Sequence, residues 1–319
     1  MEPLFSIVIA CHNHEAFIRK AVDSALSQRH PGKEIIAVDD GSGDGSAEIL
    51  RSYGKSIVFA GLPENRGAGS ARNHGASLAR GKYLVFLDGD DVLMPWALDV
   101  YDRLITACQP ELILAKCARV VGEIPAVAPE GIPHNIQFVT YPNFLSKDRP
   151  WVYNTSSFIV HRSTFQSAGG WSPDIFYQDI QDLLNKLAIA GTTALVLAPA
   201  TVWYRIHSTN AIRRITPFVE GIHVLKAKAK AGVYPGGLVA RWRRNAWFGG
   251  LIFYWAKEAL RSGLYWDAFK VLLSDGWLVV FGTLQRSAAW LGGRRPTLTL
   301  PLDLNGGSRL DSTPERVQP

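Results

Sequence analysis

Three carboxylates stand within four residues directly after an apolar segment of the chain. The apolar segment is Tyr83–Leu87, a run of β-prone residues, and the acids that follow it are Asp88, Asp90 and Asp91. Carboxylates this close repel one another, and a divalent cation that prefers hard oxygen ligands removes the repulsion. The pattern predicts a buried strand that ends at a Mg²⁺ or Mn²⁺ site on the edge of a sheet. The alternative is a strand followed by an ordinary polar turn.

A second pair of acids follows another predicted strand. Asp39 and Asp40 come directly after Glu34–Val38. Because the carboxyl ends of parallel strands meet at one edge of a sheet, we expect this pair to lie near the first acidic cluster. Asp40 is then placed to accept hydrogen bonds from a nucleotide base or a ribose hydroxyl. The alternative is a turn with solvated acids.

The first predicted strand, Phe5–Ala10, does not lead into the loop that holds a diphosphate in dinucleotide-binding folds. It runs into Cys11–His14, and the pattern G-x-G-x-x-G is absent there. Acids together with a metal ion are the remaining way to hold a diphosphate. We expect Ala10, Asn13 and Gly89 to contribute to the nucleotide site, and Asn13 also to cap the following helix.

The glycine-rich segment Glu64–Asn73 opens another predicted helix. Its small residues allow a ligand to approach the backbone closely, and Arg72 projects from the first turns of the helix. A guanidinium group there suits a phosphate or a base. The alternative is an ordinary loop with a surface arginine.

The order of the predicted elements indicates an α/β fold. Strands alternate with helices through the first hundred residues, which implies a mostly parallel sheet with right-handed crossovers. The pattern loosens after about residue 108, and residues 122–150 hold five prolines in a long excursion. The strands expected are Phe5–Ala10, Glu34–Val38, Ile57–Ala60, Tyr83–Leu87, Leu112–Lys116, Ser156–Val160, Leu195–Ala198 and Val202–Arg205. The helices expected are His14–Gln28, Ser46–Tyr53, Gly69–Arg80 and Ile180–Ala190.

Four motifs in order carry a resemblance to a known family. FSIVIACHN, VDDGSGDGS, ENRGAGSARNHG and ARGKYLVFLDGDDVLMP resemble the nucleotide-binding half of family 2 inverting glycosyltransferases, which have the GT-A fold. The resemblance covers about residues 4–100. It is weaker through residues 150–210, where Asn154, Arg162, Gly169–Trp171 and Tyr204–His207 still match family positions.

The resemblance implies roles for five residues. Asp40 matches the acid that contacts the base of the sugar nucleotide, usually uracil, and Arg72 matches a basic residue near the nucleotide. Asp88 and Asp90 match the DxD motif, in which Asp90 is the more direct metal ligand. His207 matches a histidine that in some relatives approaches the metal or the diphosphate, although a surface or hydrogen-bonded histidine is the alternative.

The catalytic base is harder to align. An inverting transfer is a single displacement, so one carboxylate must take the proton of the acceptor hydroxyl. The family supplies it from the pattern E-D-x-D-L-x-L-R-L-A, and this chain reads QDIQDLLNKLA from residue 178. Matching from the left makes Asp179 the base, whereas matching from the right puts Ile180 there. We expect Asp179 first and Asp182 second. The alternative is that both acids only favour a helix start through the dipole.

The composition is that of a globular protein whose length suits one large domain or one and a half. The chain has 319 residues, of which 47% are hydrophobic and 19% charged. Cys11, Cys108 and Cys117 have no metal-like spacing and suggest packing roles in a reducing compartment. The N-terminus lacks the basic region of a signal peptide, and no uninterrupted apolar run reaches the length of about 18 residues that suits a spanning helix. We therefore expect a cytoplasmic protein.

The C-terminal third is basic and rich in aromatic residues. Residues 216–319 carry a net charge of +7, against −1 for residues 1–215, and no acid lies between Glu220 and Glu258. Such a balance suggests an anionic partner, a membrane or nucleic acid. Trp and Phe interleaved with the basic residues favour a helix at a lipid interface, with peripheral contact to the inner face of a membrane, and no nucleic acid is expected. A helical appendage packed on the catalytic domain is the alternative. The basic residues are Lys226, Lys228, Lys230, Arg241, Arg243 and Arg244.

These observations predict three regions and one activity. We expect a GT-A catalytic domain over residues 1–215, divided near residue 108 into nucleotide-binding and acceptor-side halves, then a helical region over 216–291 and a disordered tail over 292–319. The activity is metal-dependent transfer from a nucleotide sugar, most simply a UDP-sugar, to a hydroxyl of a saccharide or lipid-linked acceptor in surface polysaccharide or glycolipid synthesis. The alternatives are a nucleotidyltransferase and a non-catalytic nucleotide-binding module.

Overall fold

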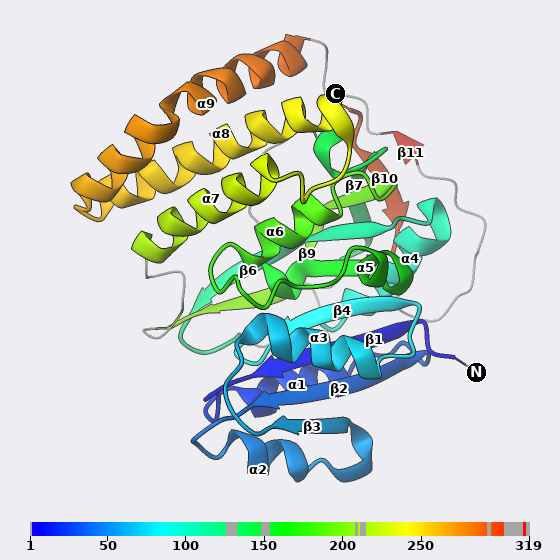
Figure 1. Cartoon of the computed structure of the whole chain (residues 1–319). Coiled ribbons are helices and arrows are strands. Elements are labelled where there is room, and N and C mark those ends of the chain that lie inside the picture. Colours follow the sequence, from blue (N-terminus) through cyan, green and yellow to red (C-terminus); the bar gives the residue numbers. More distant parts are fainter. Residues whose placement is uncertain are drawn as a thin grey trace.

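One mixed sheet runs through the chain and carries helices on both faces (Figure 1). The structure is a computed structural model that describes residues 2–125, 133–147, 154–207, 210, 215–291, 295–302 and 315–316. Within these residues the strand order is β11-β10-β7-β9-β6-β8-β4-β1-β2-β3, and the short β5 pairs with β9. The expected mixed α/β architecture is confirmed.

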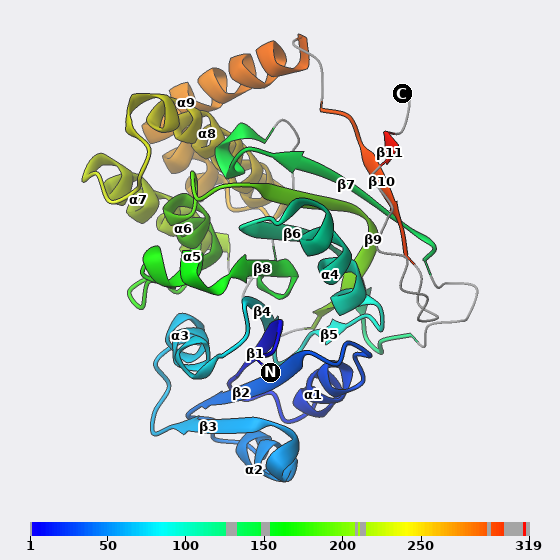
Figure 2. The ribbon, with the colours of Figure 1, turned by 90° about the vertical axis from the view of Figure 1, so that its right-hand side faces the viewer.

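The first hundred residues form a parallel half-sheet in which β4, β1, β2 and β3 are neighbours. Alternation along β1 decides which face each side chain serves: Ile7 and Ile9 join a core with α1 and α4, whereas Val8 joins the core under α3 on the other face. Figure 2 shows α1 and α3 on opposite sides of these strands. The elements are β1 (Phe5–Cys11), α1 (Ile18–Leu26), β2 (Lys33–Asp40), α2 (Ser46–Arg51), β3 (Val58–Leu62), α3 (Ala68–Leu78) and β4 (Tyr83–Asp88).

The acceptor-side half continues the same sheet with antiparallel strands. β8 lies between β4 and β6 and is antiparallel to both, while β6 and β9 are parallel. The two short strands expected near residues 195–205 are one strand, and the helix expected at 180–190 starts and ends earlier. The elements are β5 (Val92–Leu93), α4 (Ala97–Cys108), β6 (Leu112–Val121), β7 (Asn135–Tyr141), β8 (Phe158–His161), α5 (Arg162–Ser167), α6 (Asp179–Lys186) and β9 (Thr193–Ile206), with 3₁₀ turns at Phe144–Ser146 and Thr155–Ser157.

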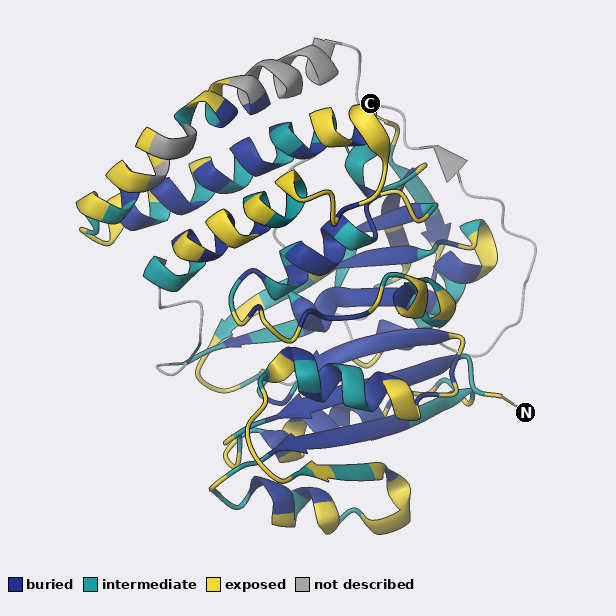
Figure 3. Cartoon of the chain, in the orientation of Figure 1, coloured by how far each residue is buried: buried dark blue, intermediate teal, exposed yellow. Residues whose placement is uncertain are grey.

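Three helices, α7 (Ile215–Lys230), α8 (Gly237–Arg261) and α9 (Tyr265–Leu291), form a layer beside α6 (Figure 1). They have their own core, which includes Ile222, Phe248 and Ile252. Figure 3 shows buried positions in α8 and many exposed positions along α9. Among the described residues, none of the helices has the length and apolarity needed to cross a bilayer.

Part of the expected disordered tail is ordered. β10 (Leu298–Pro301) pairs with the edge strand β7, and β11 (Glu315–Arg316) pairs with β10. The expectation is therefore wrong for these residues, because β7 offers an open edge whose backbone groups accept a further strand. Residues 292–294, 303–314 and 317–319 of the expected tail lie outside the described residues. Residues 126–132 and 148–153 of the proline-containing excursion also lie outside them, whereas β7 of the same excursion is described.

Candidate active site

Parallel pairing brings the two acidic clusters to one edge of the sheet. In the register of the strands, Cys11 of β1 is level with Asp39 of β2, and Ala10 is level with Asp88 of β4. A cavity of about 1450 Å³ opens there, and its lining includes Ala10, Asp40, Arg72, Asp88, Asp90, Asp179 and His207. The structure thus gathers seven of the residues singled out in the sequence around one space.

Asp40 and its neighbours form the end of the cavity nearest to β2. The buried carboxylate of Asp40 accepts a hydrogen bond of 2.8 Å from the backbone N–H of Arg66, which fixes its orientation. The ring of His12 contacts the Asp40 carbonyl oxygen at 2.8 Å and the Asn65 side chain at 2.8 Å. Sequence reasoning missed His12 and Asn65, although both stand in the motifs that carried the resemblance.

Asn13 and Gly89 do not belong to the described lining of the cavity. Asn13 has a φ of 54°, and its side-chain oxygen accepts from the backbone of Gly43 at 2.8 Å. Asn13 is not the helix cap that we expected, since α1 begins only at Ile18. At Gly89 a Cβ atom would lie 2.8 Å from Nδ1 of His14. Both residues therefore shape the turns that carry the site.

Asp90 lies between two histidines. Its Oδ2 is 2.9 Å from Nε2 of His207 and 4.0 Å from Nε2 of His14. Burial raises the pKa of Asp90, but the hydrogen bond with His207 and the charges of both histidines outweigh burial and lower it overall. Sequence reasoning did not assign His14 to the site, although its position shortly after the end of β1 could have indicated it.

Asp91 holds the turn after β4 in place. Its carboxylate accepts from the Ser156 hydroxyl at 2.5 Å and from the backbone N–H of Arg205 at 3.0 Å. Burial, followed by the charges of Asp90 and Asp88, raises the pKa of Asp91 well above its ordinary value. The third acid of the cluster therefore anchors the turn after β4 to β9 and to the 3₁₀ turn at Thr155–Ser157.

Asp88 and Asp90 suit a divalent cation that the phosphates of a bound substrate would help to hold. Among the described residues, no group of three or more His, Cys, Asp or Glu side chains is arranged to bind a metal unaided. Mg²⁺ is commonly bound by one or two carboxylates together with substrate phosphates. Asp88 and Asp90 line the cavity as such a pair, and Nδ1 of His14 beside them is buried without a hydrogen-bond partner.

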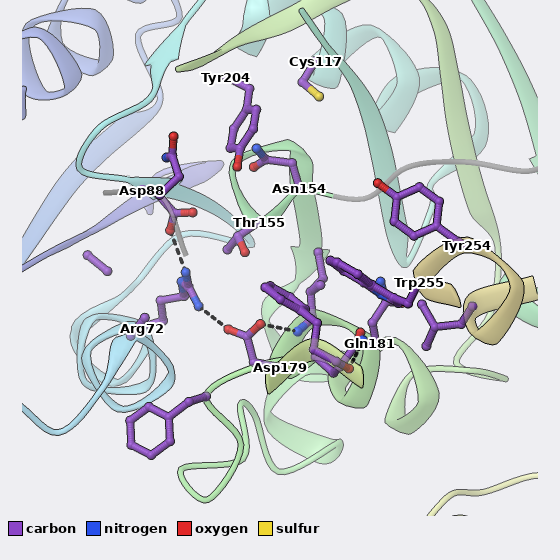
Figure 4. Close-up of a pocket in the computed structure, with 18 of the residues that line it drawn as sticks. Arg72, Asp88, Cys117, Asn154, Thr155, Asp179, Gln181, Tyr204, Tyr254 and Trp255 are labelled. Carbon is purple, nitrogen blue, oxygen red and sulfur yellow. Dashed lines mark hydrogen bonds and ion pairs between the residues drawn. The ribbon is translucent and has the colours of Figure 1, made fainter. Parts of the chain in front are cut away.

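Arg72 joins two parts of the site (Figure 4). Its guanidinium group donates to Asp88 at 2.6 Å and to Asp179 at 2.7 Å, and it lies over the ring of Trp171 at 4.8 Å. The side chain belongs to a residue only 5% exposed, so the alternative of a surface arginine is wrong. Burial alone would lower the pKa of Arg72, but the two carboxylates raise it overall, and the residue stays charged.

The two candidate bases occupy different environments. Asp179 is the first residue of α6 and lines the cavity, and burial raises its pKa although Arg72 and the backbone N–H of Ile180 oppose the rise. Asp182 is 0% exposed and does not line the cavity. It accepts from Ser172 at 2.6 Å and from Tyr234 at 2.7 Å. Asp182 is thus occupied in packing α6, and Asp179 remains the predicted base.

The far wall of the cavity comes from the helical region. In Figure 4, Tyr254 and Trp255 of α8 face Asp88 across the open space, with Tyr204, Asn154 and Thr155 between them. Most lining residues of α8 recur at helical spacing. This spacing was visible in the acid-free stretch, which we interpreted from the sequence as a lipid-interface helix or a helical appendage. The lining residues of α8 include Arg243, Ala246, Trp247, Gly250, Leu251, Tyr254 and Lys257.

The comparisons with known proteins agree with this geometry. Residues 6–108 match the family model described as "Glycosyl transferase family 2". The chain is similar to the "Putative teichuronic acid biosynthesis glycosyltransferase TuaG" of Bacillus subtilis (strain 168), at 35% identity over 153 residues, 46% of this chain and 56% of the relative. It is similar to the "Uncharacterized glycosyltransferase RP339" of Rickettsia prowazekii (strain Madrid E), at 37% identity over 36% of each chain. The chain therefore spans about half or less of these curated relatives.

Two solved structures share the fold at low sequence identity. Staphylococcus aureus TarS 1–349 in complex with UDP-GlcNAc superposes with a TM-score of 0.60 and 17% identity, over 79% of this chain and 72% of that one. The mannosyltransferase PcManGT from Pyrobaculum calidifontis, in complex with GDP-Man and Mn²⁺, gives 0.54 and 16%, over 91% and 87%. The family match over residues 6–108 and the shared fold lead to one conclusion: the chain has the GT-A fold, and its nucleotide-binding half is similar to the family 2 glycosyltransferases.

Proposed function

We propose that the protein is a metal-dependent inverting glycosyltransferase that uses a nucleotide sugar, with a UDP-sugar as the favoured donor. The observation that carries the proposal is the bridge formed by Arg72, which holds Asp88 of the acidic turn and Asp179 of α6 within one partly buried network. The bridge supports a single site in which the acidic turn would hold the diphosphate and Asp179 would act as the catalytic base. Asp40 lies beyond Asp88 along the strand ends, where a nucleotide base would fit.

Each group has a defined task in a single displacement. Asp179 takes the proton of the acceptor hydroxyl at its carboxylate, and burial, which raises its pKa, makes that carboxylate a better proton acceptor. Arg72 keeps the carboxylate oriented and compensates its charge. A divalent ion, held by Asp88 and Asp90 near His207, would neutralise charge on the leaving diphosphate.

The wall of α8 supports an extended acceptor. Trp247 and Tyr254 present aromatic rings to the cavity, and Arg243 and Lys257 add cationic groups from the same helix. Aromatic rings suit the apolar faces of sugars as well as lipid chains. We propose a saccharide or lipid-linked acceptor in surface polysaccharide or glycolipid synthesis, in keeping with the teichuronic acid biosynthesis named for TuaG.

A panel of sugar nucleotides tests the proposal. In thermal unfolding with Mn²⁺, we expect one UDP-sugar to stabilise the protein, by about 2.7 kcal/mol at a hundredfold excess over its dissociation constant. The same donor should release UDP slowly by hydrolysis in the presence of Mn²⁺. Absence of both effects across the panel contradicts the proposal, and stabilisation without turnover favours a non-catalytic nucleotide-binding module.

We also propose peripheral contact with the inner face of an anionic membrane, through α9 more than through the basic segment. The six basic residues do not form one solvated face: Arg244 is 3% exposed and binds Asn185, Arg243 lines the cavity, and Lys228 contacts Ser172. Helix α9 instead exposes large apolar side chains at spacings of three and four residues, a stripe formed by Trp266, Phe269, Leu273, Trp277 and Val280.

Liposome co-sedimentation tests the membrane contact. The triple variant Trp266→Ser, Phe269→Ser, Trp277→Ser should lose binding to vesicles with anionic lipid, because the stripe supplies the apolar area that enters the interface. The control variant Val58→Ser, Leu78→Ser, Val121→Ser removes exposed apolar residues elsewhere and should bind like wild type. High salt should weaken binding, since the electrostatic attraction fades beyond the Debye length of about 10 Å at 0.1 M salt. Wild type that stays in the supernatant at low salt contradicts the proposal.

A further inference from the structure

The turn that leads into α6 has an unusual backbone and a partner in the helical region. Gln178, directly before Asp179, has a φ of 67°, in the left-handed region that non-glycine residues rarely adopt. The residue is 2% exposed, and its side-chain Nε2 donates to the carbonyl oxygen of Phe218 in α7 at 2.9 Å. The hydrogen bond that Gln178 donates to α7 therefore stabilises a backbone conformation that a non-glycine residue disfavours.

Helix α7 is shaped to reach this turn. At Gly221 an added Cβ atom would lie 2.9 Å from Cγ of Gln178 and 3.1 Å from the carbonyl oxygen of Tyr177. The ring of Phe218 lies 5.1 Å from that of Tyr177, edge to face, and stacks on Trp255 of α8 at 4.4 Å. Helices α7 and α8 thus hold the turn by backbone approach, by a hydrogen bond and by aromatic packing.

We propose that Gln178 is a positioning residue through which α7 and α8 set the direction of the Asp179 carboxylate. The inference rests on the proposed role of Asp179 as the base. The φ and ψ angles of Gln178 determine where the first residue of α6 points, and Arg72 holds that carboxylate from the other side. The side-chain amide is suited to the task because its N–H donates to a carbonyl oxygen, which an ionised glutamate in the matching family position cannot do.

Three variants test the proposal, with UDP release from the donor chosen in the panel as the assay. Gln178→Met keeps the length of the side chain and removes the donor. Gln178→Gly removes the hydrogen-bond donor, but glycine readily adopts the left-handed conformation. Gly221→Ala adds a Cβ atom on α7 that would clash with the turn. A misplacement of about 1 Å can cost about 100-fold in rate, so we expect kcat to fall about 10- to 100-fold in each. The KM of the nucleotide sugar and its thermal shift should remain unchanged, because Gln178 lies in the turn before α6 and Gly221 lies against that turn, not at the strand ends that carry Asp40 and Asp88.

Thr216→Val is the matched control. It removes the 3.0 Å hydrogen bond from α7 to Asp267 of α9 without touching the turn, and it should keep the kcat of wild type. Wild-type kcat in Gln178→Met, or an equal loss of kcat in Thr216→Val, overturns the proposal. If Gln178→Met does not fold, Gln178→Gly and Gly221→Ala decide by the same criterion. Lack of UDP release by wild type would instead remove the proposed function, so the two failures are distinct.

Discussion

Replacing Asp179 by Asn is expected to lower donor turnover by about 10²- to 10⁴-fold while the affinity for the nucleotide stays as in wild type. The amide keeps the shape of the side chain and can still accept from Arg72, but it does not take a proton from the acceptor. Turnover is measured as UDP release, and affinity as the thermal shift caused by UDP with Mn²⁺. Near-normal turnover in Asp179→Asn would show that another group is the base.

Asp182→Asn is the paired variant on the same helix. Asp182 is buried beside Lys186 at 3.2 Å and Lys228 at 3.6 Å, and loss of its charge leaves these ammonium groups poorly compensated. Breaking a buried ion pair costs about 3 kcal/mol or more, so this variant should lose stability but keep the turnover of each folded molecule. The reverse pattern, with a stable but inactive Asp182→Asn, would contradict the assignment of the two acids.

Asp90→Ala is expected to abolish turnover and to remove the effect of Mn²⁺ on UDP affinity. Without this carboxylate the histidines beside it have no acid between them, and a divalent cation would lose one of the two carboxylates proposed to hold it. Titration of UDP into wild type and Asp90→Ala, each with Mn²⁺ and with EDTA, measures the effect. An affinity of wild type for UDP that is the same in EDTA would contradict the proposed metal site.

The nucleotide-binding half was predictable because its signals are local. Fully buried strands read as continuous apolar runs, and the acids that end them stand next to them in the sequence, so β2 and β4 could be placed within a few residues. The start of α1 was not predictable from Asn13, because that side chain binds the loop at Gly43. Contacts with a distant segment decided between two acceptable local structures.

The remainder of the site depends on tertiary contacts that no local pattern encodes. Asp179 and Asp182 are both helix-start acids, and tertiary contacts separate them: Asp179 lines the cavity beside Arg72, whereas Asp182 is buried against Tyr234. The pairing of β10 with β7 likewise depends on the open edge of β7, which lies far from β10 in the sequence. The basic and aromatic composition of α8 is visible in the sequence, but only the structure shows that residues of this helix line the cavity.

Helix α8 both lines the cavity and contributes to the core of the helical region, which affects how this protein can be shortened or recombined. A chain shortened to end near residue 215 would keep the strand ends and the acids of the nucleotide site, yet one side of its cavity would open to solvent. It would also lose the stacking of Phe218 on Trp255. If the acceptor binds against α8, as we propose, exchanging α7–α8 between relatives is expected to transfer acceptor preference and to leave donor choice with the host chain.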